Sequence, residues 1–120
     1  MRYFSTRDKT LDFKFKDIFL RGLAPDGGLF IPSDFKRYSK TEIKNLSELS
    51  YTDLATEIIS NFCQPDLEKT KLKSLIEKSY KNFSNKEVVK IKKIGGINLL
   101  ELYNGPTLAF KDIALSLIHI

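Results

Sequence analysis

The spacing of apolar residues changes once along this chain, and the change divides it into two parts. Up to about residue 83, apolar residues recur every three or four positions, the pattern of helices that bury one face. From Val88 they alternate with lysines, and Gly95–Gly96 separates this run from a second apolar run, Ile97–Tyr103, which is typical of a β-hairpin. The pattern predicts one domain over residues 1–83 and a second segment over residues 84–120, with a hairpin across Val88–Tyr103. The longest helical stripe contains Leu72, Leu75, Ile76, Ser79, Tyr80 and Phe83.

Short elements are expected at the start of the chain. The segment Arg2–Thr6 is typical of a strand, and Leu29–Pro32 of a brief buried strand that proline closes. Between them, the apolar spacing predicts a helix over Phe15–Gly22, with Asp12 as its cap. The residues of Ala24–Gly28 favour turns. We interpret the two glycines as a tight turn and not as a phosphate-binding loop, because no glycine-rich phosphate motif is present.

Two capping boxes predict two further helices. Ser39 and Ser50 each stand three residues before an acid, so that a hydroxyl and a carboxylate can satisfy free backbone N–H groups. These elements together predict an N-terminal α+β domain of short strands and packed helices. The helix after Ser50 is expected to bury a face made of Leu54, Ile58, Ile59 and Phe62.

The single cysteine and the absence of long apolar runs bear on the cellular compartment of the protein. Cys63 cannot form an internal disulfide, and its apolar neighbour Phe62 favours a buried packing role over a nucleophile. A lone cysteine agrees with a reducing compartment. No apolar run approaches the roughly 18 residues of a membrane span, and the N-terminus lacks a signal-peptide core. We therefore expect a cytoplasmic protein without a membrane partner.

The net charge of +5 raises the possibility of nucleic-acid binding. The charge comes mainly from lysines scattered between Lys9 and Lys93 with acids among them, whereas nucleic-acid modules concentrate basic and aromatic residues on one face. The distribution favours a solvated surface and no nucleic-acid partner.

The residues around Lys111 allow two interpretations. An ammonium group in an apolar, water-poor setting is destabilised, which makes the amine a nucleophile toward an aldehyde. Ala109 and Phe110 precede Lys111 and provide apolar neighbours. The other interpretation is a lysine whose stem packs while its charged end reaches solvent. Taken alone, the local residues favour the second interpretation.

Four segments of the chain resemble signatures of threonine synthases. The sequence Gly-Pro-Thr-Leu-Ala-Phe-Lys-Asp at 105–112, within Leu99–Asp112, resembles the segment that contains the pyridoxal-phosphate lysine of that family. Tyr3–Arg7, Gly22–Pro32 and Ser50-Tyr51 resemble three earlier signatures, in the same order. The resemblance implies that residues 84–120 begin a truncated α/β catalytic domain of pyridoxal-phosphate fold type II, the tryptophan synthase β type.

The resemblance also implies an activity. Pyridoxal 5'-phosphate would be held as a Schiff base on Lys111, which would be both the catalytic and the cofactor-binding residue. The substrate would be O-phospho-L-homoserine, which loses phosphate by γ-elimination and adds water at the β carbon to give L-threonine. Phe110 and Asn104 could line the cofactor, and Asp112 could cap a following helix. Many relatives have histidine where this chain has Asn104.

The same resemblance implies that this piece is incomplete and inactive by itself. The glycine-rich loop for the cofactor phosphate and most of the substrate site would lie beyond residue 120. The final residues Leu115–Ile120, which include His119, depart from the family pattern, either as a native helix or as an artefact of sequence assembly. Two alternatives stay open: a threonine-synthase-like phospho-lyase, and a small basic binding module without catalytic activity.

Overall fold

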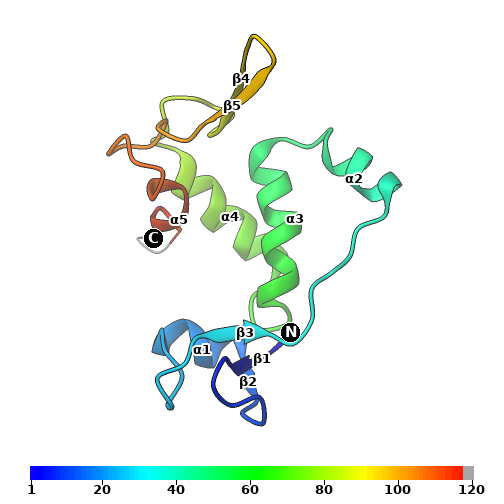
Figure 1. Cartoon of the computed structure of the whole chain (residues 1–120), viewed down its shortest axis with the longest axis vertical. Coiled ribbons are helices and arrows are strands. Elements are labelled where there is room, and N and C mark those ends of the chain that lie inside the picture. Colours follow the sequence, from blue (N-terminus) through cyan, green and yellow to red (C-terminus); the bar gives the residue numbers. More distant parts are fainter. Residues whose placement is uncertain (118–120) are drawn as a thin grey trace.

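The computed structural model describes residues 1–117 and places the elements in three groups along the long axis of the molecule (Figure 1). A small sheet with helix α1 lies at one end, two packed helices α3 and α4 lie in the middle, and a β-hairpin extends at the other end. The expectations for Ile118, His119 and Ile120 fall outside the described residues. This arrangement agrees with the predicted mixture of short strands and packed helices.

The first sheet has three antiparallel strands. Strand β1 (Arg2–Ser5) lies between β2 (Phe13–Lys14) and β3 (Phe30–Pro32), and α1 (Phe15–Arg21) follows β2 directly. The prediction that Asp12 caps α1 is wrong. The Asp12 carboxylate pairs with the Arg2 guanidinium, and Lys14 occupies the N-cap position. The expected burial of the 29–32 strand is also wrong, because β3 is only half-buried.

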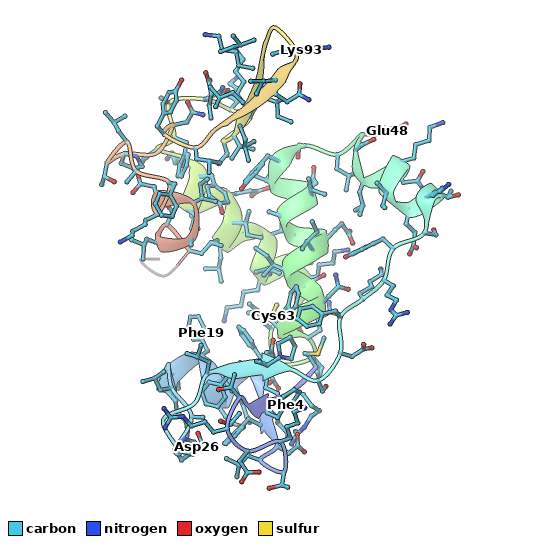
Figure 2. All side chains as sticks on the ribbon, in the orientation of Figure 1. Phe4, Phe19, Asp26, Glu48, Cys63 and Lys93 are labelled. Atoms are coloured by element: carbon cyan, nitrogen blue, oxygen red, sulfur yellow. The ribbon has the colours of Figure 1, made fainter. Side chains whose placement is uncertain are left out.

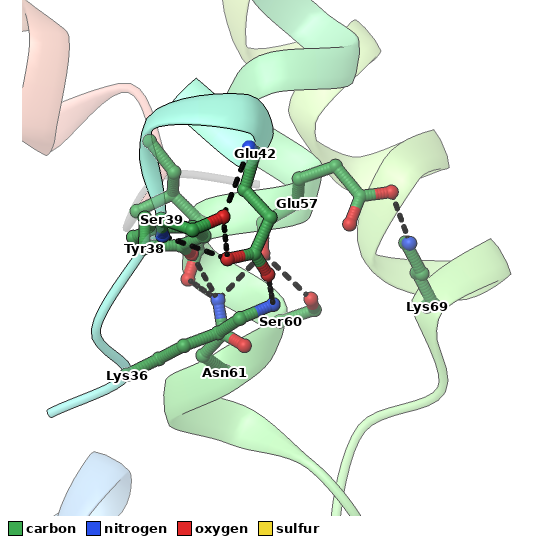
Figure 3. Close-up of polar contacts among 9 residues, drawn as sticks. Lys36, Tyr38, Ser39, Glu42, Glu57, Ser60, Asn61 and Lys69 are labelled. Atoms are coloured by element: carbon green, nitrogen blue, oxygen red, sulfur yellow. Dashed lines mark hydrogen bonds and ion pairs between the residues drawn. The ribbon is translucent and has the colours of Figure 1, made fainter. Parts of the chain in front are cut away.

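Helix α2 (Lys40–Leu46) begins with the predicted capping box. The Ser39 hydroxyl accepts a hydrogen bond from the Glu42 backbone N–H at 3.2 Å, and the Glu42 carboxylate accepts one from the Ser39 N–H at 2.8 Å. Figure 3 shows how this end of α2 meets α3, where the Asn61 amide donates to the Tyr38 hydroxyl at 2.8 Å. The capping box therefore fixes where α2 begins, and the bond between Tyr38 and Asn61 connects that start to α3.

Helices α3 (Tyr51–Cys63) and α4 (Lys69–Tyr80) pack against each other and form the main core. Leu72, Ile76 and Tyr80 are buried, as the stripe on α4 predicts. An ion pair from Lys73 to Asp53, at 2.7 Å, joins the exposed edges of the two helices. The core cluster is made of Cys63, Leu72, Ile76, Tyr80 and Val88.

The predicted buried face of α3 is only partly correct, because Ile59 packs against the core but none of the four predicted residues is fully buried. Its buried residues are Thr56, Ser60 and Cys63, whereas Ile58 is exposed. The Thr56 hydroxyl donates to the Thr52 carbonyl at 2.7 Å, and the Ser60 hydroxyl donates to the Glu57 carbonyl at 3.0 Å. Because these hydroxyls are satisfied within their own helix, they can be buried at little cost. The buried position of Cys63 confirms its expected packing role.

The sheet is attached to the end of α3 by two hydrogen bonds. The Tyr3 hydroxyl donates to the Phe62 carbonyl at 2.6 Å, and the N-terminal ammonium donates to the Gln64 carbonyl at 2.7 Å. Figure 2 shows Cys63 at this junction, between the helices and the sheet. The N-terminal elements therefore share one continuous framework.

The predicted hairpin is confirmed, with β4 (Lys90–Ile94) antiparallel to β5 (Ile97–Glu101). Gly95 has φ = 59°, the left-handed conformation that a two-residue turn requires. Val88 itself lies before the hairpin and is buried in the helical core. A loop then leads to α5 (Asp112–Leu115), and Leu117 packs partly on the core.

Candidate functional site

Lys111 stands where the loop after the hairpin enters α5. It occupies the N-cap position of that helix, and its side chain is exposed. Across residues 1–117 its ammonium group forms no ion pair. Phe110, next to it, leaves 65% of its side chain exposed. Two consecutive residues of the loop, one aromatic and one with an amine, are therefore both exposed.

The loop that carries Lys111 is closed on its inner side by Asp112. One carboxylate oxygen accepts from the Thr107 hydroxyl at 2.6 Å, and the other accepts from the Thr107 backbone N–H at 2.8 Å. These bonds hold the pKa of Asp112 below its ordinary value, the Thr107 hydroxyl contributing most. The expected role of Asp112 as a helix cap is wrong, because its side chain bonds backward to the loop while it forms the first residue of α5.

The middle of the loop adopts an unusual backbone conformation. Leu108 has φ = 59°, which costs a non-glycine residue about 1–2 kcal/mol. Its backbone N–H donates to the Gly105 carbonyl at 3.1 Å. Such a conformation persists only where its surroundings hold it. Nothing in the residue type of Leu108 could have indicated it from the sequence.

Asn104 ties the start of the loop to the preceding turn. Its side-chain amide donates to the Val88 carbonyl at 3.0 Å, and its own carbonyl accepts from the Ser84 backbone N–H at 2.9 Å. The side chain of Asn104 is thus engaged with the turn before the hairpin. Its suggested contact with the cofactor stays a prediction, as does that of Phe110.

Tyr80 connects the helical core to α5. Its hydroxyl donates to the Ile113 carbonyl at 2.8 Å, and its ring packs edge-on against Tyr51 and Phe83. Burial raises the pKa of this phenol, so it stays a hydrogen-bond donor across the physiological range. The N-terminal helices are therefore bonded directly to the segment that follows Lys111.

A cavity of about 430 Å³ lies between α4 and the inner side of the loop. Lys78 and Asn82 line it from the α4 side, and Thr107 and Asp112 line it from the loop side. Lys111 does not contribute to its walls. Lys111 therefore lies outside this cavity.

A second polar cluster joins two of the sequence signatures at the opposite end of the molecule, where Figure 2 labels Asp26. One Asp26 oxygen accepts from the Ser5 hydroxyl and from the Gly28 backbone N–H, both at 2.8 Å. These bonds, that of Gly28 first, hold the pKa of Asp26 below its ordinary value. A Cβ on Gly28 would overlap the Ser5 side chain, so glycine is needed there for space. The Gly27-Gly28 segment forms the predicted turn, but the sequence did not indicate the bond between Asp26 and Ser5.

The N-terminal residues match a known protein family. A family profile described as "Threonine synthase N terminus" matches residues 2–80, which is more than half of the chain and includes the sheet and α1–α4. The chain belongs to the threonine synthase family. The resemblance stated from the sequence signatures is thereby confirmed.

Solved and curated members of the threonine synthase family align over nearly all of the chain. The PLP-bound threonine synthase of Brucella melitensis is 32% identical with a TM-score of 0.92, over 98% of this chain and 26% of that one. The threonine synthase of Schizosaccharomyces pombe is 39% identical, over 94% of this chain and 22% of its own length. The threonine synthase-like 2 protein of Xenopus laevis is 36% identical, over 97% of this chain and 25% of its own length.

This chain therefore spans about a quarter of the relatives that it matches. The α/β fold expected from the sequence is confirmed for that quarter, which includes α5 and the Lys111 loop. Each helix within residues 1–117 is too short or too polar to cross a lipid bilayer.

Proposed function

We propose that this chain supplies the N-terminal domain and the cofactor lysine of a threonine synthase. The whole enzyme would convert O-phospho-L-homoserine and water into L-threonine and phosphate. We place the domain boundary near residue 83, with residues 84–120 opening the catalytic domain. We also propose a cytoplasmic location. One observation carries the proposal: the chain aligns over 98% of its length with a PLP-bound threonine synthase, and its loop at 105–112 holds an exposed lysine that has no ion pair within residues 1–117.

The residues of the loop fit pyridoxal phosphate. A lysine amine can form a Schiff base with the cofactor aldehyde, and Lys111 Nζ is exposed and forms no ion pair within the described residues, so the aldehyde can reach it. When bound, pyridoxal phosphate supplies an electron sink for negative charge at substrate carbons. Lys111 would hold the cofactor at rest and then carry protons at the α and β carbons of the substrate. The rest of the loop would keep that amine in place.

A test of this proposal needs the other three quarters of the enzyme. In a hybrid, residues 1–112 would replace the matching part of the Schizosaccharomyces pombe threonine synthase. We expect Lys111→Ala to abolish both the visible absorbance of lysine-bound pyridoxal phosphate and the formation of threonine. Lys93→Ala, which alters an exposed lysine of the hairpin, is the matched control and should keep both. Full absorbance and turnover in the Lys111→Ala hybrid would refute the proposal.

The similarity to threonine synthase-like 2 supports a second candidate, a phospho-lyase that acts on the same substrate. Such an enzyme would release phosphate without adding water at the β carbon. Measuring phosphate and threonine in the same reaction separates the two: equal amounts indicate a threonine synthase, and phosphate without threonine indicates the lyase.

A further inference from the structure

Asp112 and Lys111 are neighbours in sequence but lie on opposite sides of the loop. The Lys111 side chain is exposed, whereas Asp112 is only 6% exposed. Both Asp112 oxygens bond to the same residue, Thr107, five positions earlier. A carboxylate that takes two donors from one residue fixes both its own orientation and that of its partner. The loop between Thr107 and Asp112 is therefore closed into a small ring, which we call the Thr107–Asp112 clamp.

The residues inside and beside the clamp agree with this role. Gly105 is buried, and a Cβ there would overlap the Asp112 side chain. Its φ lies outside the left-handed region, so glycine is required for space and not for backbone freedom. Leu108 adopts a left-handed conformation within the ring, with its side chain exposed. No packing of the Leu108 side chain explains that conformation, whereas closure of the ring by Asp112 does.

We propose that Asp112 is a positioning residue: the Thr107–Asp112 clamp presets the backbone of the loop so that Lys111 presents its amine outward in one conformation. The inference rests on the proposed function of Lys111 and adds a positioning role for Asp112. The clamp accounts for glycine at 105, threonine at 107 and aspartate at 112, since each is needed for its geometry. Asp112 would contact neither cofactor nor substrate, because its carboxylate faces Thr107 and the cavity beside Lys78.

The first test uses the chain itself and needs no cofactor. Asp112→Ala removes both acceptors, and alanine suits the first turn of α5. Amide hydrogen exchange followed by NMR should show the Thr107 N–H exchanging at least tenfold faster than in the parent. The strong intraresidue NOE between the Leu108 N–H and Hα, a sign of positive φ, should weaken. Amides in α3 and α4 should keep their rates.

Two further variants separate the clamp from a general loss of stability. Asp112→Asn should restore exchange at Thr107 to within about threefold of the parent, because an amide can accept from the backbone N–H and donate to the hydroxyl. Thr107→Val removes only the hydroxyl and should give part of the Asp112→Ala effect. An unchanged loop in Asp112→Ala would overturn the proposal. Equal acceleration of amides throughout α3 and α4 would also overturn it, since it would show a purely structural role.

The second test uses the hybrid enzyme and distinguishes this proposal from that on Lys111. In Asp112→Ala we expect the bound-cofactor absorbance to persist, kcat to fall roughly 100-fold and KM to change less than threefold, because misplacing a reacting group costs about that much. Asp112→Asn should recover most of kcat. If Lys111→Ala abolishes the absorbance while Asp112→Ala matches the parent in kcat, the proposed function of Lys111 is supported and the proposed role of Asp112 is refuted. If the absorbance persists in Lys111→Ala, the proposed function of Lys111 is refuted.

Discussion

Truncation of Ile76 should test whether the α3–α4 core holds the chain together. The Ile76 side chain is fully buried, at 0% exposure, in the core cluster with Cys63 and Val88. Ile76→Ala removes three carbon groups, which amounts to ~2.4 kcal/mol of lost burial at about 0.8 kcal/mol each. The residual cavity raises the expected cost to about 3–4 kcal/mol, a large part of the stability of a small domain.

The matched control is Ile97→Ala, which makes the same chemical change in the hairpin at a side chain that is 72% exposed. Urea unfolding followed by circular dichroism gives the free energy of unfolding for both variants. We expect the midpoint for Ile76→Ala to fall with an unchanged slope, and that for Ile97→Ala to stay within about 0.5 kcal/mol of the parent. Equal losses in the two variants, or a cost below about 1 kcal/mol for Ile76→Ala, would refute the assignment of the core.

Of four other predictions, three concern the loop at 105–112 and the bond from Tyr80 to the helix after it, and the fourth concerns the buried Cys63. Tyr80→Phe removes the buried bond to the α5 carbonyl and should lower the free energy of unfolding by about 1 kcal/mol in urea titrations. Gly105→Ala should destabilise the chain in thermal melts because its Cβ would meet Asp112, whereas Gly96→Ala, which has nothing within 4 Å, should not. The depressed pKa of Asp112 means that its stabilisation is present above its ordinary value of 3.8 and is lost as pH falls through the lower folded pKa. An NMR titration of the loop amides against pH should show that loss of stabilisation. The Asp112→Ala variant should show no such pH-dependent change. Burial raises the pKa of the Cys63 thiol, so alkylation monitored by mass spectrometry should be slow in native protein and fast in urea.

The sequence predicted the elements whose signals are local. The capping box at Ser39, the apolar stripe on α4 and the Gly95–Gly96 turn each depend on residues within a few positions of one another, and all three are confirmed. The buried face of α3 could be predicted only in part from apolar spacing. Its hydroxyl residues, such as Thr56, are buried by bonding to their own helix, which hydrophobic patterning does not detect.

The candidate site could be predicted only in part, because no sequence pattern indicates some of its contacts. Lys111 is a candidate because the segment around it resembles a family motif, and no local property of the residue distinguishes it from the other lysines. Asp112 was recognised but given the wrong partner, since its bonds run back to Thr107 and not into α5. The positive φ of Leu108, inside the loop that those bonds close, had no signal in the sequence either. Interactions between residues that the chain brings together by folding were the ones that the sequence could not supply.

The most direct measurement of the central claim is to find which lysine carries the cofactor. The hybrid enzyme would be loaded with pyridoxal phosphate, reduced with borohydride to make the linkage permanent, digested and analysed by mass spectrometry. We expect one pyridoxyl group per chain, on the peptide that contains Lys111, and none on the exposed hairpin lysines such as Lys93. A group attached elsewhere, or spread over many lysines with Lys111 unmodified, would contradict the account.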